Sequence, residues 1–395
     1  MIRRREVLTI GVSGALGVLA GGSPWLAGLA DASAVAGEGP HGPLLDPDEN
    51  GIMLPAGFRS RLIARSLEIV PGTDYEWHIF PDGGATYRTV TGWIYVSNSE
   101  IPGTGGVGAL RFNGSGEVVD AYSILGGTVQ NCAGGKTPWN TWLSCEEYSG
   151  GYVFECDPFG WREALVRPAL GRFQHEAVAV DPGGRCLYLT EDVGDGGFYR
   201  FTPDRWRDLS GGRLEIAAVD DDGRVTWLEV PDPDPAIEEG AVETRYQVEG
   251  ATPFRGGEGI VVHRRSVFFT TKGDDRVWEY DAIRRSIDVV YDASLDPGRQ
   301  LTGVDNLEVG RNGDLVVAED GGNMELVVLT RRGIAYPLLR FVDQEQSELA
   351  GPAFSPDGRR LYVSSQRDRG VGATYEIAGP FRKRPSRRRL ARRFF

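Results

Sequence analysis

Short apolar runs, each ending on a small residue, recur along most of the chain and are separated by turns rich in glycine and aspartate. Residues 94–97 (IYVS) and 361–364 (LYVS) are two examples. The small residues stand at positions 97, 144, 190, 270, 318 and 364, so they lie 46 to 48 residues apart except for one interval of 80. A repeat of about 40–50 residues built from short strands is typical of a β-propeller in which each repeat forms one blade.

Each repeat contains four strand-like segments, which in the fourth repeat are residues 260–262, 267–271, 276–281 and 287–291. The sixth repeat ends at residues 374–377 without an obvious fourth strand. Residues 58–64 could supply that strand and close the ring, which would protect the sheet edges. The sequence therefore predicts an all-β, six-bladed propeller over residues 35–380. The long interval predicts an insertion between blades three and four, at residues 231–253, which either forms a lid over the mouth or decorates an edge.

The first 34 residues have the features of an export signal. Arg4 and Arg5 precede an apolar, glycine-rich run that extends to about residue 20, and residues 32–34 (ASA) offer a small-residue cleavage site. The arginine pair followed by Glu6-Val7-Leu8 resembles a twin-arginine signal. An ordinary secretory signal is the alternative, and either one predicts a periplasmic, extracellular or cell-surface protein.

Charge is distributed unevenly along the chain. The formal net charge is −13, yet residues 381–395 contain eight basic residues and no acid. An acidic body repels nucleic acid and attracts cations, so we expect no nucleic-acid partner. The basic tail either makes a weak contact with an anionic surface or is a solvated, disordered end. We expect the protein to be a monomer.

All four cysteines lie between residues 132 and 186. In an exported protein the default expectation for cysteines is disulfide bonds. Cys145 and Cys156 fall on neighbouring strands of one predicted hairpin and form a reasonable pair. Cys132 begins a blade at a position where other blades carry carboxylates, and its own sequence leaves both a disulfide and a metal ligand open.

Acidic residues recur in phase with the repeat, and we expect them to meet at one mouth of the central channel. They begin the first strand of several blades or follow the second strand, and the clearest are Glu146, Glu147, Glu176, Glu191, Glu258, Asp305, Glu319 and Glu348. Several carboxylates cannot all stay ionised in one mouth without strong repulsion. Bound cations relieve that repulsion, and carboxylate-rich sites select hard metals such as calcium or ferric iron.

Several of these segments resemble the PhoX-type alkaline phosphatases, a family of exported six-bladed propellers. The matching segments are NCAGGKTPWNTWLSCEE (131–147), GRFQHEAVAVD (171–181), GEGIVV (257–262), VDNLEV (304–309), VVAEDGG (316–322) and SELAGPAFSPDGRRLYVSSQ (347–366). The resemblance implies a cluster of Fe(III) and Ca ions that hydrolyses phosphomonoesters, so that the partner is a small phosphate ester.

The resemblance also implies a division of the metal ligands. Cys132, Glu147 and Glu176 would ligate the iron cluster, joined by Glu258. Glu146, Glu319 and Glu348 would be ligands of calcium.

Three further residues are candidates for contact with the substrate. Asn98 and Arg255 would bind the phosphate oxygens, although Arg255 stands one residue further from Glu258 than the family pattern has it. His175, beside Glu176, would orient a ligand or donate a proton to the leaving oxygen, with a purely structural histidine as the alternative.

Two other classes of function remain open at this stage. One is a calcium-dependent lactonase or organophosphate hydrolase built on a propeller, against which Cys132 and the twin-arginine-like signal argue. The other is an exported propeller that binds a partner without catalysis, which would need no convergent acids.

Overall fold

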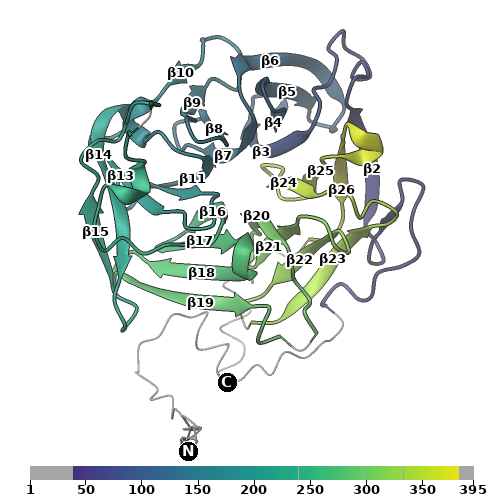
Figure 1. The fold of residues 1–395 in the computed structure, drawn as a ribbon. Helices are drawn as coiled ribbons and strands as arrows, with labels where there is room; N and C mark the ends of the chain where they lie inside the picture. The colour runs from purple at the N-terminus through teal and green to yellow at the C-terminus, as the bar shows by residue number, and fades with distance from the viewer. Residues whose placement is uncertain (1–38, 239, 297, 332, 382–395) are drawn as a thin grey trace, which may run out of the picture.

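The computed structural model describes residues 39–381 except 239, 297 and 332. Over these residues the chain forms six antiparallel sheets arranged around one central axis, as Figure 1 shows. The predicted six-bladed propeller is therefore confirmed. Residues 1–38 and 382–395, which contain the predicted export signal and nearly all of the basic tail, lie outside the described residues. No helix among the described residues is long and apolar enough to cross a membrane.

The first three blades follow one another along the chain. Blade one contains β3 (Pro81–Arg88), β4 (Gly92–Ser99), β5 (Gly105–Asn113) and β6 (Val118–Thr128); blade two contains β7 (Asn131–Lys136), β8 (Trp142–Glu146), β9 (Val153–Cys156) and β10 (Leu165–Val166); blade three contains β11 (His175–Asp181), β12 (Cys186–Glu191), β13 (Phe198–Arg205), β14 (Asp208–Val219) and β15 (Val225–Glu229). Blade three thus has a fifth strand, β15, which accounts for part of the 80-residue interval.

The other three blades complete the circle, and two of them take their outermost strand from the N-terminal side of the chain. Blade four contains β16 (Gly257–His263), β17 (Ser266–Thr271), β18 (Arg276–Asp281) and β19 (Ser286–Asp292); blade five contains β20 (Val304–Val309), β21 (Leu315–Glu319), β22 (Glu325–Leu329), β23 (Ala335–Phe341) and β1 (Ile52–Met53); blade six contains β24 (Leu349–Phe354), β25 (Arg360–Ser365), β26 (Ala373–Ala378) and β2 (Arg59–Arg65). Short 3₁₀ helices are η1 (Pro168–Leu170), η2 (Thr244–Tyr246), η3 (Lys272–Asp274) and η4 (Asp368–Gly370).

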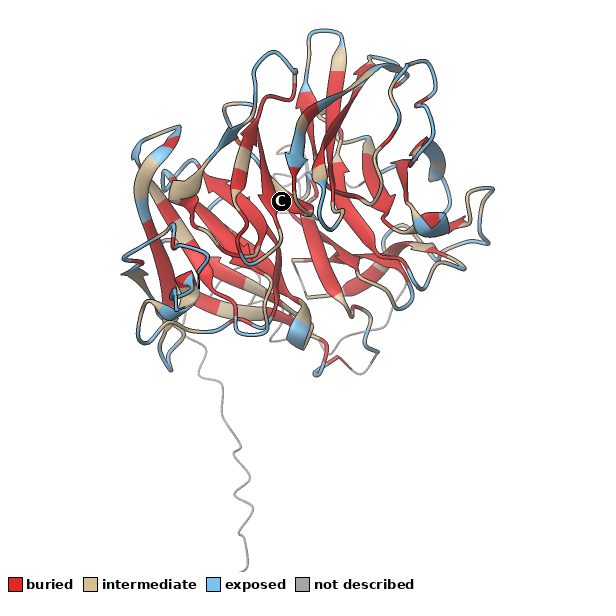
Figure 2. Cartoon of the chain, turned by 45° about the horizontal axis from the view of Figure 1, so that its top comes forward, coloured by how far each residue is buried: buried red, intermediate tan, exposed pale blue. Residues whose placement is uncertain are grey.

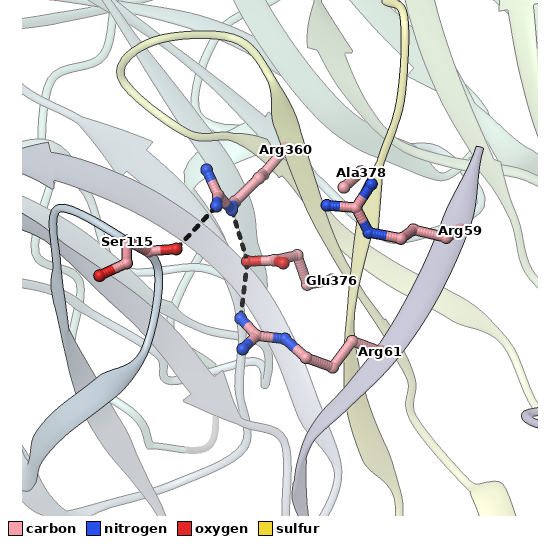
Figure 3. A pocket seen from close by; sticks show the side chains of 6 residues that line it. All are labelled: Arg59, Arg61, Ser115, Arg360, Glu376 and Ala378. Carbon is pink, nitrogen blue, oxygen red and sulfur yellow. Dashed lines mark hydrogen bonds and ion pairs between the residues drawn. The ribbon is translucent and has the colours of Figure 1, made fainter. Parts of the chain in front are cut away.

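Strand β2 closes the ring as the sequence predicts, because it pairs antiparallel with β26 of the last blade. Charged side chains hold this closure, and Figure 3 shows them around a small pocket of about 150 Å³. The carboxylate of Glu376 lies 3.0 Å from the guanidinium of Arg61 and 3.2 Å from that of Arg360. The two arginines also donate to the carbonyls of Gly116 and Ser115 in blade one. The buried Glu376 and its two arginines thereby link the N-terminal strand, the last blade and the first blade.

The hydrophobic core consists of six clusters of buried side chains, one between each pair of neighbouring blades among the described residues. Figure 2 shows the same distribution, with buried residues along the strands and exposed residues in the connecting loops. Trp93, Phe112 and Tyr362, for example, pack together between blades one and six. Each blade is therefore buried on both faces, which explains why its strands read as continuous apolar runs.

The predicted insertion packs along the rim of blades two and three. Asp234 accepts a hydrogen bond of 2.8 Å from the hydroxyl of Tyr152, and Arg245 forms an ion pair of 2.9 Å with Glu191 at the end of β12. The hydroxyl of Thr244 donates to the carbonyl of Arg172. These contacts fix the segment against the loop that follows β8, the end of β12 and the loop that precedes β11.

Candidate metal centre

A β-bulge interrupts the first strand of every described blade at the same place. The pairing of β11 with β12, for instance, shifts register between His175 and Val178, so that Glu176 lies in the bulge. A bulge re-aims the side chain that it contains. The first residues of the six bulges are Asp82, Cys132, Glu176, Glu258, Asp305 and Gly351. We call this set the bulge ring.

The bulges let the first strands of neighbouring blades approach very closely at the axis. A side chain added at Gly83 would lie 2.5 Å from the Cα atom of Ala133, and one added at Gly259 would lie 2.6 Å from the Cα atom of Asn306. Only glycine fits at such distances. The residue after the acid is thus glycine at Asp82 and Glu258, where the close approach of the next first strand leaves no room for a side chain.

A second set of equivalent residues directly follows the second strand of each blade. In all six described blades the backbone N–H of this residue donates to a carbonyl just before or at the start of the first strand. The six residues are Glu100, Glu147, Asp192, Lys272, Asp320 and Gln366. We call this set the strand-end ring. Four of its members are acids, and Lys272 is the one cation among them.

Strand alternation decides which of two adjacent acids faces the mouth. Successive residues of a strand point to opposite sides, so the residues just before the strand-end ring point away from it. Glu146 accepts hydrogen bonds from the backbone N–H groups of Val129 (2.8 Å) and Tyr152 (3.1 Å). Glu319 likewise accepts from the N–H groups of Thr302 and Glu325, at 3.0 Å each. Both carboxylates bind backbone N–H groups and belong to none of the groups of potential metal ligands described below.

In blades three and four, the small residue that marks the repeat positions the bulge of the next blade. The hydroxyl of Thr190 donates to the carbonyl of Glu258, and that of Thr270 donates to the carbonyl of Asp305, each at 2.6 Å. Between blades one and two this contact is made by the amide of Asn98, which donates to the carbonyls of Cys132 (3.0 Å) and Ala133 (2.7 Å). Thr190 and Thr270, two of the residues that mark the repeat in the sequence, therefore help to place the acids Glu258 and Asp305.

The two rings bring potential metal ligands together in four groups, in each of which the donor atoms lie within 4.8 Å of one another. The groups are Asp82, Glu100 and Cys132; Cys132, Glu147 and Glu176; Glu176, Glu258 and Asp305; and Asp305, Asp320 and Glu348. Neighbouring groups share Cys132, Glu176 or Asp305, so the ligands form one continuous arc. Of the predicted metal ligands, Cys132, Glu147, Glu176, Glu258 and Glu348 lie in this arc, whereas Glu146 and Glu319 do not.

The protein environment strongly disfavours ionisation of this arc. Burial, followed by the charge of neighbouring acids, raises the pKa of Glu176 and Glu258 well above its usual range. The same causes raise the pKa of Glu147 to about 9. Burial also raises the pKa of Asp305, to about 7, although Lys272 acts in the opposite direction. Burial and the nearby carboxylates raise the pKa of the Cys132 thiol as well. A bound cation would favour the ionised forms of all five groups.

Two cationic side chains, Lys272 and Arg367, form ion pairs with acids of the arc. Lys272 Nζ lies 2.9 Å from a carboxylate oxygen of Glu258, 3.2 Å from Asp320 and 4.0 Å from Asp305. Burial lowers the pKa of Lys272, but the charges of these three acids outweigh it and raise that pKa overall. At the end of the arc, Arg367 forms an ion pair of 2.6 Å with Glu348.

The other end of the arc is bordered by amides. Gln366 Nε2 donates to Asp82 (2.5 Å) and Glu100 (2.6 Å), and its buried Oε1 has no partner among the described residues. Gln174 Nε2 donates to Glu147 at 3.0 Å. Amides position carboxylates without neutralising them, so this end keeps its affinity for a cation.

Two of the three predicted substrate contacts, Asn98 and His175, are enclosed within the fold. Asn98 is fully buried, and its amide oxygen accepts from Trp142 Nε1 (2.8 Å) and the Ser144 hydroxyl (3.0 Å), so all its bonds join blades one and two. Arg255 is exposed and precedes the bulge of blade four.

His175 is also enclosed in the structure. It is fully buried, lies against Phe173, and has Nε2 2.9 Å from the carbonyl of Gly171. Burial lowers its pKa to about 3, which keeps the ring neutral.

The four cysteines are free thiols in this structure. The expected pair of Cys145 and Cys156 is therefore wrong, and strand register gives the reason. Cys145 is opposite Val153, whereas Cys156 is opposite Trp142. An offset of three residues puts the two sulfurs on different faces of blade two, in two different core clusters.

Beyond the bulges the first strands enclose a cavity of about 550 Å³ along the axis. Its lining includes Gly84, Gly134, Val178, Ile260 and Leu307, and it is mostly uncharged. The acids thus occupy one end of the central channel.

Comparison with known proteins agrees with this architecture. The family model described as alkaline phosphatase PhoX matches residues 104–150 and 148–368. The chain belongs to the PhoX family. No curated protein sequence matches the chain. The structure of Pseudomonas fluorescens PhoX in complex with vanadate, a transition-state analogue, matches with a TM-score of 0.69 and 17% identity, covering 85% of this chain and 97% of that one.

Two further solved structures match less closely. A protein of unknown function from Bacteroides thetaiotaomicron gives a TM-score of 0.51 at 9% identity, over 81% of this chain and 76% of that one. A gluconolactonase from Xanthomonas campestris gives 0.48 at 14% identity, over 87% and 99%. The reaction class is supported by the PhoX family membership, since likeness at these identities shows the fold alone.

Sequence reasoning missed several residues of this centre. Asp82 is followed by two glycines and reads as an ordinary turn, although it lies one repeat before Cys132. Lys272 and Gln366 are not acidic, so a search for acids passes over them. Their common signal is position, because each directly follows the second strand of its blade.

Proposed function

We propose that this protein is a metal-dependent phosphatase that hydrolyses phosphomonoesters at the arc of acids. PhoX family membership supports the reaction class. The single observation that carries the metal dependence is the convergence of a thiol and carboxylates, with donor atoms within 4.8 Å, in four overlapping groups.

The donor chemistry divides the arc into two kinds of site. Cys132 belongs to the two groups that also contain Asp82, Glu100, Glu147 and Glu176, and a thiolate among carboxylates suits iron better than calcium. The group of Asp305, Asp320 and Glu348 offers only carboxylates and suits calcium. In this proposal Cys132, Glu147 and Glu176 hold iron, and Glu348 helps to hold calcium. Glu146 and Glu319 support the neighbouring loops instead.

Hydrolysis of a phosphate ester mostly requires positioning and charge neutralisation. When bound, the metal ions would offset the charge of the phosphoryl oxygens and activate water as a nucleophile. The chain itself fixes the ligands: Thr190 and Thr270 hold the bulges of Glu258 and Asp305, and Gln174 orients Glu147. Lys272 and Arg367 add positive charge to a mouth that would otherwise repel a phosphate dianion.

Metal analysis together with a phosphatase assay tests the proposal. We expect the purified protein to contain iron and calcium and to show the colour of a ferric thiolate. It should lose the hydrolysis of p-nitrophenyl phosphate when a chelator removes the metal ions. Cys132→Ser should remove iron, colour and activity. The matched control is Cys186→Ser, which changes a buried free thiol outside the four groups and should keep all three. Full activity in a protein without iron would contradict the iron centre and leave a calcium-only hydrolase.

We also propose that the enzyme acts after export, because residues 1–34 have the features of a twin-arginine-like signal. That route would allow the cluster to assemble before export. Fusing residues 1–34 to a reporter, with Arg4 and Arg5 changed to lysine as the control, tests this. Export that is unaffected by the double change would instead indicate an ordinary secretory signal.

A further inference from the structure

The six-fold equivalence of the blades shows that Lys272 stands at a position where four other blades carry an acid. In blade two, the bulge residue, the strand-end residue and the next bulge residue are Cys132, Glu147 and Glu176, which form one of the ligand groups. The same three positions of blade four are Glu258, Lys272 and Asp305. A cation of the chain thus replaces one carboxylate of this group.

The positive charge of Lys272 also lies close to the surrounding carboxylates. Its ammonium lies 2.9 Å from Glu258, 4.0 Å from Asp305 and 3.2 Å from the strand-end acid Asp320. Its side chain is 34% exposed, while those of Glu258 and Asp305 are nearly closed off from solvent. An ammonium in contact with three carboxylates repels any divalent ion that would bind between them.

We propose that Lys272 acts as a built-in cation between Glu258 and Asp305, so that this part of the arc binds no metal ion. This inference rests on the proposed metal-dependent function and refines it. Metal ions then bind on either side, at the two groups that contain Cys132 and at the group of Asp305, Asp320 and Glu348. The chain thereby balances the charge of the arc with one ion fewer than its acids would otherwise require.

Calcium binding to variants of the full-length protein tests the inference. Lys272→Met removes the charge at nearly constant volume, and Lys272→Glu restores the acid that the equivalent blades carry. By equilibrium dialysis against calcium, each variant should bind one more calcium ion per chain than the wild type. Lys272→Arg keeps the positive charge and should bind the wild-type number. The matched control is Lys136→Met, because Lys136 contacts Thr86 and Tyr87 away from the arc and should leave the number unchanged.

The outcomes separate the inference from the proposed function. An unchanged calcium number in folded Lys272→Met and Lys272→Glu would overturn the inference. A wild-type protein that has no phosphatase activity would refute the proposed function, yet a calcium ion gained on loss of the lysine charge would still support the inference. If Lys272→Glu folds only in the presence of calcium, its melting temperature should rise with calcium more steeply than that of the wild type, which is the same result measured through stability.

Discussion

Asn98, which the sequence suggested as a phosphate contact, is expected from the structure to hold blades one and two together, and its substitution distinguishes these two roles. Its buried side chain makes four hydrogen bonds, to Trp142, to Ser144 and to the carbonyls of Cys132 and Ala133. Each bond contributes about 0.5–1.5 kcal/mol net, and a buried partner left unpaired costs about 1–3 kcal/mol. Asn98→Ala should therefore lower the free energy of unfolding by about 4 kcal/mol.

Urea denaturation followed by tryptophan fluorescence, in the presence of a chelator, measures this loss without a contribution from metal binding. A change in the midpoint at constant slope would report stability alone. Asn113→Ala is the control, because Asn113 makes its side-chain hydrogen bonds within an exposed turn, and its loss should be about 1 kcal/mol. The structural role would be refuted if Asn98→Ala kept the wild-type midpoint and raised the KM for a phosphate ester, which is the result expected of a phosphate contact.

Three further predictions follow from the contacts described above. Glu147→Gln should lower the iron content, whereas Glu146→Gln should leave it unchanged. Glu146→Gln should instead lower the free energy of unfolding by about 1–3 kcal/mol, because Glu146 binds loop N–H groups. Equal iron contents of the two variants by metal analysis would contradict the assignment. Glu376→Gln should lower the free energy of unfolding, measured by urea denaturation, by about 2 kcal/mol, because it leaves Arg61 and Arg360 without their shared carboxylate. This magnitude lies between those of exposed and buried ion pairs. A loss below about 0.5 kcal/mol would contradict a role in ring closure. The protein from which a chelator has removed the metal should lose stability as pH rises from about 4.5 to about 9. The reason is that the raised pKa values of Asp305 (about 7) and Glu147 (about 9) make the folded state bind more protons than the unfolded state over this range. Melting temperatures measured with and without metal check this, and a rise in stability of the metal-free protein with pH would contradict it.

The fold of this protein could be predicted from its sequence because a propeller repeats one local pattern. Each blade is buried on both faces by its neighbours, so its strands are apolar and end at turns, and the period of 46 to 48 residues is visible in the chain. The pairing of β2 with β26, which closes the ring, was predicted for a similar reason, since the last repeat lacks a fourth strand. The convergence of Cys132, Glu176 and Glu258 follows from phase, because equivalent positions of all blades meet at the axis.

Only the tertiary structure decided which side chains of the rim face the mouth. Glu146 and Glu147 are adjacent in sequence, and strand alternation sends one to the loop and the other to the arc. The strand register separates Cys145 from Cys156 by three positions, which no spacing along the chain reveals. Lys272 is an unremarkable lysine in a turn until the backbone shows that it is equivalent to Glu147 and Asp320. Residue type and phase are properties of the sequence, whereas the direction of a side chain depends on bulges and register that form when the strands pair.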